Sequence, residues 1–226
     1  MIASVFLLSD TAYLNPQVQA AVNLELSVRG WDIAYVSATT RPTSNEFFER
    51  TTHEYQTMFR RSKLSYYDLS DEFSDSDLLE LLEFDAVHLS GGNVFDFCMS
   101  VERRGLGALL RRYIRADGLI IGVSAGAIIL TPSLKIGHIA GDEPNGQTTV
   151  EGLGLVPLEF FPHYMKASDN LLVNYSNSAS RPVYACPDTD GVLLKDGVLE
   201  TFGQIMKFER GLQMTAAQFE TIQLVA

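Results

Sequence analysis

The sequence is poor in the residues on which several classes of protein depend. It has two cysteines in 226 residues, Cys98 and Cys186, each in an apolar setting and without the spacing of a disulfide framework. A disulfide scaffold is therefore excluded, and buried, reduced thiols typical of a cytoplasmic protein are expected. Only four histidines occur, and no group of histidine, cysteine and carboxylate residues has the spacing of metal ligands. We expect neither a metal nor an organic cofactor.

Positive charge is also scarce. There are 17 lysines and arginines against 28 aspartates and glutamates, which gives a net charge of −11. A nucleic-acid partner is not expected, because binding phosphates requires a basic face. The arginines gather in residues 60–63 and 103–115, in helical stretches with acidic neighbours, which is typical of solvated helix faces.

Long apolar runs are missing as well. The first ten residues, MIASVFLLSD, lack a basic leader and reach Asp10 at once, which favours a first core strand over a signal peptide. No run is long enough to cross a bilayer, so no membrane partner is expected. Hydrophobic residues make up 46% of the chain and charged residues 20%. With no repeat and no low-complexity tract, this composition indicates a single soluble α/β domain over residues 1–226.

Strand and helix patterns alternate through the first half of the chain. Asn15 and Pro16 begin a helix that Gly30 ends, and Ser74 with Asp77 forms a capping box for a later helix. A further amphipathic helix is expected up to about residue 61. Buried strands are predicted over residues 2–8, 31–36, 64–69, 86–89 and 119–121. This alternation predicts a three-layer fold, a mainly parallel sheet with helices on both faces.

The second half has a different pattern. Residues 136–146 are polar and contain glycine, which favours an exposed hairpin or flap, and residues 158–161 form another short strand. Short strand-like runs over residues 183–204 are separated by close turns. These turns predict antiparallel strands at one edge of the sheet, near the C-terminus.

The stretch from Leu119 to Ala127 is the most informative in the chain. Its apolar run ends in small residues around one hydroxyl, with Gly122 two residues before Ser124 and Gly126 two after it. This pattern is typical of a nucleophile elbow, in which a strand turns sharply into a helix and the serine takes a strained conformation. It also fits an ordinary tight turn that contains a serine, so the elbow alone does not establish catalysis.

A second loop is expected beside this elbow. The strand over residues 86–89 runs directly into Ser90-Gly91-Gly92-Asn93, and the carboxyl ends of parallel strands lie at one edge of the sheet, where ligands bind. The backbone N–H of Gly92 could pair with that of Ala125 in an oxyanion hole. We expect Asn93, at the end of the loop, to contact substrate.

A serine nucleophile needs a base, and the base needs an acid to hold it. His53 lies in a charged helix and His88 in a buried strand, so both are poor candidates. His163 follows a strand end, and this position favours it over His138 in the flap. Three aspartates compete for the acid and stay unranked by the pattern alone: Asp188, Asp190 and Asp142.

Five phrases occur in the order and spacing of one known family: LSGGNVF (89–95), IGVSAGAIIL (121–130), GLGLVP (152–157), FPHY (161–164) and CPDTDG (186–191). On these motifs the chain resembles the dipeptidase E family of serine peptidases, which includes the aspartyl dipeptidases and the cyanophycinases. The resemblance runs from the second strand to the tail and implies a fold like that of class I glutamine amidotransferase domains. It implies a role for five residues: Ser124 as nucleophile, His163 as general base, Asp188 where aspartyl dipeptidases carry a glutamate, and Gly92 and Ala125 as oxyanion donors.

One departure concerns specificity. Aspartyl dipeptidases hold the substrate's aspartate with an arginine after the histidine motif, whereas residues 165–180 here contain Lys166 but no arginine. The sequence thus predicts a cytoplasmic serine peptidase whose partner is a short peptide, and a homo-oligomer is compatible with it. Two alternatives stay open. One is an α/β-hydrolase-type esterase, whose order of serine, acid and histidine would pair Asp142 with His163. The other is a non-catalytic, amidotransferase-like binding domain.

Overall fold

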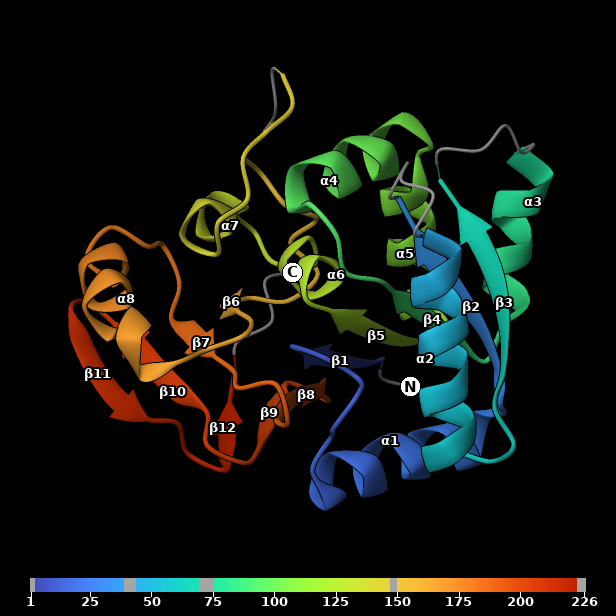
Figure 1. Cartoon of the computed structure of the whole chain (residues 1–226), viewed down its shortest axis with the longest axis horizontal. Helices are drawn as coiled ribbons and strands as arrows, with labels where there is room; N and C mark the ends of the chain where they lie inside the picture. Colours follow the sequence, from blue (N-terminus) through green and yellow to red (C-terminus); the bar gives the residue numbers. More distant parts are fainter. Residues whose placement is uncertain (1–2, 39–43, 70–74, 147–149, 223–226) are drawn as a thin grey trace.

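A large mixed sheet forms the centre of the molecule (Figure 1). The computed structural model describes residues 3–38, 44–69, 75–146 and 150–222. The strands of this sheet are β1 (Ser4–Leu8), β2 (Asp32–Ser37), β3 (Lys63–Asp68), β4 (Ala86–Leu89), β5 (Leu119–Val123), β8 (Gly191–Lys195), β9 (Val198–Phe202) and β12 (Phe219–Thr221). Their order is β12-β9-β8-β1-β5-β4-β2-β3. Strands β1 to β5 pair in parallel, and β8, β9 and β12 extend the sheet in antiparallel fashion.

Helices cover both faces of this sheet, as predicted. The helices of the structure are α1 (Pro16–Arg29), α2 (Ser44–Met58), α3 (Asp75–Glu80), α4 (Val94–Arg103), α5 (Leu106–Arg115), α6 (Ala125–Ile128), α7 (Lys135–Ile139) and α8 (Asp169–Ser176), with 3₁₀ turns η1 (Leu81–Glu83) and η2 (Lys166–Ser168). Of these, α8 packs on a second sheet and not on this one. Along β1, Phe6 and Leu8 pack with α1 and α2, while Val5 and Leu7 pack with the apolar faces of α4 and α5. This alternation buries both faces of the strand and confirms the three layers.

Helix α1 shows how local sequence sets an element that the site depends on. The Asn15 side chain accepts hydrogen bonds from the N–H groups of Gln17 and Val18, Pro16 occupies the first turn, and Gly30 ends the helix at φ 141°. A side chain at Gly30 would collide with the carboxylate of Asp85. The predicted cap, first turn and end of this helix are therefore confirmed.

A second sheet was not predicted. Its strands are β6 (Glu159–Phe161), β7 (Val183–Ala185), β10 (Met206–Glu209) and β11 (Leu212–Thr215). They lie in the order β11-β10-β7-β6, with α8 packed on β10 and β11 (Figure 1). The expectation that the runs after residue 183 all join one edge of the main sheet was therefore wrong for β7, which pairs in parallel with β6. It was right for the β8–β9 hairpin, which joins the main sheet through β1.

Other boundaries also differ from the prediction. The expected hairpin over residues 136–146 begins instead as α7, because Ile136 is buried and Gly137 packs closely on Val94. Helix α2 ends at Met58, short of residue 61. The capping box of Ser74 and Asp77 falls outside the residues whose side chains the structure describes.

A buried group of charges joins α1 to the first residue of β1 and the last residue of β8. The Glu25 carboxylate, on α1, accepts hydrogen bonds from Ser4 Oγ at 2.7 Å and from Lys195 Nζ at 2.7 Å, and it forms an ion pair with Arg29. Burial raises the pKa of Glu25, but the hydrogen bonds from Lys195 and Ser4 and the charge of Arg29 outweigh it and hold the pKa below its ordinary value. The charge is thus stabilised inside the fold.

Both cysteines are free and buried, as expected. Burial raises the pKa of the Cys98 thiol to about 11, so this group stays protonated at neutral pH. Within the described ranges, no helix is both long and apolar enough to cross a membrane.

Candidate active site

The serine of the predicted elbow lies between β5 and α6. Ser124 has φ 52° and ψ −114°, a region that residues with a side chain rarely adopt. Its N–H donates to the carbonyl of Leu8, at the end of β1, over 2.9 Å. The predicted turn from strand to helix is present, and it holds the serine in a conformation that costs about 1–3 kcal/mol.

Two glycines make this turn possible through close contacts. A Cβ on Gly126 would lie 2.1 Å from the carbonyl oxygen of Leu89, and one on Gly122 would lie 2.7 Å from the carbonyl oxygen of Gly126. The N–H of Gly126 donates to the carbonyl of Ser90 over 3.0 Å. The start of α6 is therefore pressed against the end of β4, which brings the following loop beside Ser124.

That loop contains Gly92, one of the two residues predicted to be oxyanion donors. A Cβ on Gly91 would lie 3.5 Å from the Cβ of Ser124, and Gly92 has φ 140°, which favours glycine. Among the described residues, no backbone carbonyl accepts a hydrogen bond from the N–H of Gly92 or of Ala125. Both N–H groups thus lie in the two loops beside the serine without a backbone partner, as an oxyanion hole requires.

Histidine and aspartate come together on the small sheet. Strands β6 and β7 are parallel neighbours with Phe161 opposite Ala185, and the N–H of Cys186 donates to the carbonyl of Phe161 over 2.9 Å. His163 lies two residues beyond β6, and Asp188 lies three beyond β7. The segments that follow β6 and β7 therefore run side by side. His163 Nδ1 lies 2.6 Å from Asp188 Oδ1.

The same histidine reaches the elbow. Its Nε2 lies 2.9 Å from Ser124 Oγ. A carboxylate only accepts hydrogen bonds, so the contact with Asp188 places the proton on Nδ1 and leaves Nε2 as the acceptor for the serine hydroxyl. The side chains of His163 and Asp188 are 48% and 59% exposed. The histidine is thus accessible from solvent.

The three candidate acids occupy different places. Asp188 contacts His163, whereas Asp190 is buried and accepts hydrogen bonds from Asn15 Nδ2 and from the N–H of Gln204. Asp142 accepts from the N–H of Val94, at the start of α4, over 3.0 Å, and burial raises its pKa. The pairing of Asp142 with His163 that an esterase-type order would need is therefore replaced by a contact with α4.

The other three histidines lie away from Ser124. His88 is buried with Nδ1 2.9 Å from Tyr55 Oη, and burial lowers its pKa to about 3, so the ring is neutral. His138 packs its ring on Phe95, and His53 is exposed on α2. Among the described residues, no three histidine, cysteine or carboxylate side chains gather as ligands for a metal ion.

Asn93 is part of the framework of the loop. Its Oδ1 accepts from the N–H groups of Phe95 and Asp96 and so caps α4, while its Nδ2 donates to the carbonyl of Glu143. Both polar groups of the side chain have protein partners, and its contact with substrate stays a prediction. Sequence reasoning missed Ser9, whose hydroxyl accepts a hydrogen bond from the N–H of His163.

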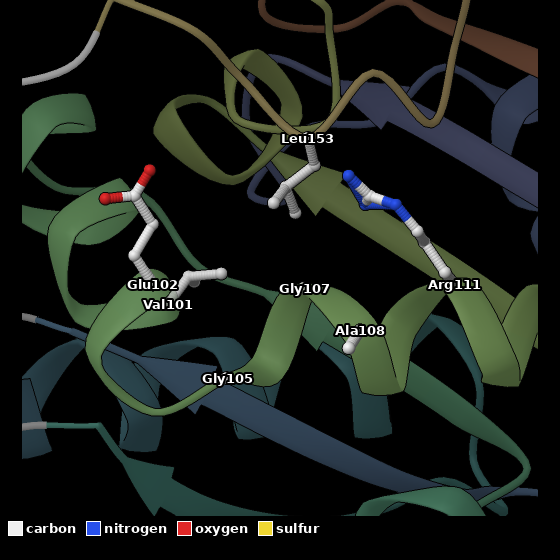
Figure 2. Close-up of a pocket in the computed structure, with 7 residues that line it drawn as sticks. All are labelled: Val101, Glu102, Gly105, Gly107, Ala108, Arg111 and Leu153. Carbon is white, nitrogen blue, oxygen red and sulfur yellow. The ribbon is translucent and has the colours of Figure 1, made fainter.

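A hollow of about 360 Å³ lies away from these residues, between the end of α4, the start of α5 and the loop at Leu153. Figure 2 shows Leu153 reaching toward α5, with Arg111 on one side and Glu102 on the other. A Cβ on Gly107 would lie 2.9 Å from the Leu153 side chain. None of the residues that line the hollow belongs to the group around Ser124.

Comparison with known proteins identifies the family of this chain. The family model described as peptidase family S51 matches residues 5–201, which include the elbow, the histidine and all three candidate acids. The chain belongs to peptidase family S51. This is a family of serine peptidases, so the resemblance found from the five motifs is confirmed.

The chain spans about two thirds or less of the length of the curated relatives that it matches. The chain is 28% identical over 136 residues to an uncharacterized peptidase of Listeria innocua, covering 57% of this chain and 64% of that protein. It is 37% identical over 89 residues to Peptidase E of Streptomyces coelicolor, covering 39% of this chain and 35% of that protein. The crystal structure of a peptidase from an acI-B1 Actinobacterium superposes with a TM-score of 0.73 at 14% identity, covering 98% of each chain. The S51 chain therefore shares this fold over nearly its whole length.

Proposed function

We propose that this S51 chain is a serine peptidase that cleaves short peptides through an acyl-enzyme on Ser124. The observation that carries the proposal is the continuous line of hydrogen bonds from Asp188 through His163 to Ser124, at 2.6 Å and 2.9 Å. A nucleophile, its base and the acid that orients the base form the recurring arrangement of serine hydrolases.

Each residue has a defined part in the proposed reaction. His163 Nε2 takes the proton of Ser124 Oγ as the oxygen attacks the peptide carbonyl, and the N–H groups of Gly92 and Ala125 receive the negative oxygen. The histidine then gives that proton to the leaving amine, which departs and leaves an ester on Ser124. A water molecule attacks this ester while His163 takes its proton, and the histidine returns that proton to Ser124 Oγ as the bond to the acyl group breaks and the acid product leaves.

The placement of the proposed base and acid follows from strand pairing. Asp188 keeps the proton on Nδ1 of His163 and stabilises the imidazolium that forms during each transfer. Because His163 and Asp188 follow parallel neighbours, β6 and β7, their spacing is fixed by backbone hydrogen bonds. No step in this scheme requires a metal ion.

Labelling with a fluorophosphonate probe tests the proposal, followed by a panel of dipeptides and p-nitrophenyl esters. We expect covalent labelling of Ser124, and turnover of peptides. His163→Gln should abolish labelling, while His53→Gln, a change at an exposed histidine of α2, serves as the matched control and should leave it intact. Absence of labelling in the wild-type protein would favour the binding domain, and turnover of esters alone would favour the esterase.

A further inference from the structure

One buried hydroxyl touches the backbone of both segments that carry the candidate base and acid. Ser9 follows the last residue of β1 and is fully buried. Its Oγ donates to the carbonyl of Cys186 over 2.7 Å and accepts from the N–H of His163 over 3.1 Å. Cys186 lies two residues before Asp188, so this hydroxyl bridges the histidine segment and the aspartate segment.

The same strand end also holds the nucleophile. The carbonyl of Leu8, next to Ser9, accepts the N–H of Ser124. Leu8 and Ser9 therefore contact the backbone at Ser124, at His163 and just before Asp188. Strand β1 belongs to the large sheet, whereas His163 and Asp188 follow strands of the small sheet. The end of β1 is thus a place where hydrogen bonds connect the large sheet to the segments that follow the small sheet's strands.

A hydroxyl suits this position for chemical reasons. It supplies one donor and two acceptor lone pairs, so it can bond an N–H and a carbonyl at once. The N–H that it holds belongs to His163, which has φ 53°, a backbone conformation that is uncommon for residues other than glycine. Without the hydroxyl, the N–H of His163 and the buried carbonyl of Cys186 would each lose this partner.

We propose that Ser9 is a positioning residue, which sets the placement of the His163–Asp188 pair relative to Ser124. The inference rests on the proposed function, because it assigns Ser9 a role in orienting the proposed base. Ser9 acts through backbone groups and has no contact with the reacting atoms. Displacing a catalytic group by about 1 Å can cost 10²-fold in rate, so loss of this bridge should affect turnover more than binding.

The test compares Ser9→Ala with Ser4→Ala. Ser4 is a buried serine at the opposite end of β1, and its hydroxyl donates a hydrogen bond to the carboxylate of Glu25. We expect Ser9→Ala to lower kcat by about 10- to 100-fold with KM within about twofold. Ser4→Ala should lower Tm and leave kcat within about twofold, because its partner lies away from the site. Equal kcat in the two variants would overturn the proposal.

A second pair of variants separates the hydroxyl from the packing. Threonine keeps the hydroxyl and valine has nearly the same shape without it, so Ser9→Thr should retain at least tenfold more kcat than Ser9→Val. Equal rates in these two folded variants would contradict the proposal. If neither folds, the comparison of the two alanine variants still decides it.

A spectroscopic signal reports on the geometry directly. The His163 Nδ1 proton, held in a short contact with Asp188, should give a downfield proton resonance in the wild-type protein that Ser9→Ala shifts or broadens and Ser4→Ala leaves unchanged. Ser124→Ala is run in the same activity assay. If Ser124→Ala retains activity, the proposed function fails. If it is inactive while Ser9→Ala matches wild type in rate and resonance, only the inference about Ser9 fails.

Discussion

Two fully buried serines lie at opposite ends of β1 and have different partners: Ser4 is its first residue, and Ser9 follows its last. At its amino end, Ser4 donates to the Glu25 carboxylate within a group of paired charges. At its carboxyl end, Ser9 bridges the N–H of His163 and the carbonyl of Cys186. The hydroxyl of Ser4 donates a hydrogen bond to a buried carboxylate, and that of Ser9 connects two segments of backbone.

The two ends of β1 contribute to different properties: the amino end to the stability of the fold and the carboxyl end to the placement of the candidate site. The amino end holds a carboxylate whose pKa is held low by its partners, which stabilises the fold at neutral pH. The carboxyl end holds Ser124 and His163 at φ 52° and 53° and leaves the His163–Asp188 pair about half exposed. Substitutions at the two ends should therefore affect different measurements.

The largest effect is expected at the carboxyl end. Ser124→Ala should reduce peptidase activity by about three or more orders of magnitude, because it removes the proposed nucleophile. It should leave Tm nearly unchanged, since alanine keeps the Cβ and the backbone conformation of the elbow. Activity is measured with dipeptides and unfolding by calorimetry. Wild-type activity in this variant would refute the mechanism. A large fall in Tm would show that the carboxyl end of β1 also contributes to stability, contrary to the comparison above.

The acid gives the next largest effect. Asp188→Asn should lower kcat by about 10²- to 10³-fold, because an amide no longer fixes the proton on Nδ1 of His163. Asp142→Asn should have a much smaller effect, since an amide oxygen can still accept the N–H of Val94. Asp190→Asn should lower stability more than turnover, because Asp190 holds the N–H of Gln204. If Asp142→Asn proves the most damaging, the acid assignment moves to the segment after α7.

At the amino end, stability should change without loss of activity. Glu25→Gln should reduce the free energy of unfolding by about 3 kcal/mol at pH 7, because it leaves Lys195 and Arg29 without their buried partner. The pKa of Glu25 is below its ordinary 4.5 in the fold. Its contribution is thus fully present above about pH 4.5 and is lost as the pH falls through the folded pKa.

Urea unfolding at pH 7 and at pH 3.5 measures this difference. The gap between wild type and Glu25→Gln should narrow at the lower pH, while kcat at pH 7 stays within about twofold. Glu49→Gln, at an exposed position on α2, is the matched control and should change stability by less than about 0.5 kcal/mol. A gap that is equal at both pH values would show that the charge of Glu25 is not what stabilises this end.

The smallest effect concerns selectivity at the carboxyl end. Holding an aspartate side chain favours a fixed guanidinium, and Lys166 and Arg181 are both exposed on the surface. We therefore expect the kcat/KM values for Asp-Leu and Ala-Leu to differ by less than about tenfold, or ~1.4 kcal/mol. Steady-state kinetics with the two dipeptides measures the ratio. A preference of several hundredfold for Asp-Leu would show that one of these cations reaches the substrate.

Local patterns predicted the elements that have local causes. The cap of α1, the buried parallel strands and the elbow around Ser124 depend on neighbouring residues, namely a side-chain acceptor, an apolar run and small residues at fixed offsets. The β8–β9 hairpin was also predictable, because the pair Asp196-Gly197 is typical of a two-residue hairpin turn. Both residues have the positive φ that such a turn needs.

The small sheet had no such signal. Strands β6 and β7 have three residues each and pair in parallel across more than twenty residues of sequence, so neither length nor alternation predicts their pairing. The ranking of the three candidate acids depends on that pairing, which brings Asp188 beside His163. Ser9 was missed for the same reason, since a serine after a strand has no motif and both its partners are distant in sequence.

The position of β1 between β5 and β8 has a consequence for synthesis of the chain. Strands β1 to β5 leave the ribosome first and can pair in parallel, but the outer edge of β1 has no partner until β8 (Gly191–Lys195) emerges. An unpaired edge strand invites pairing with other chains. Asp188 emerges just before β8. The nascent chain therefore gains its proposed acid at almost the same time as β8 covers the free edge of β1. Premature termination before β8 would release a product that lacks the β8 partner of β1 and is prone to aggregate.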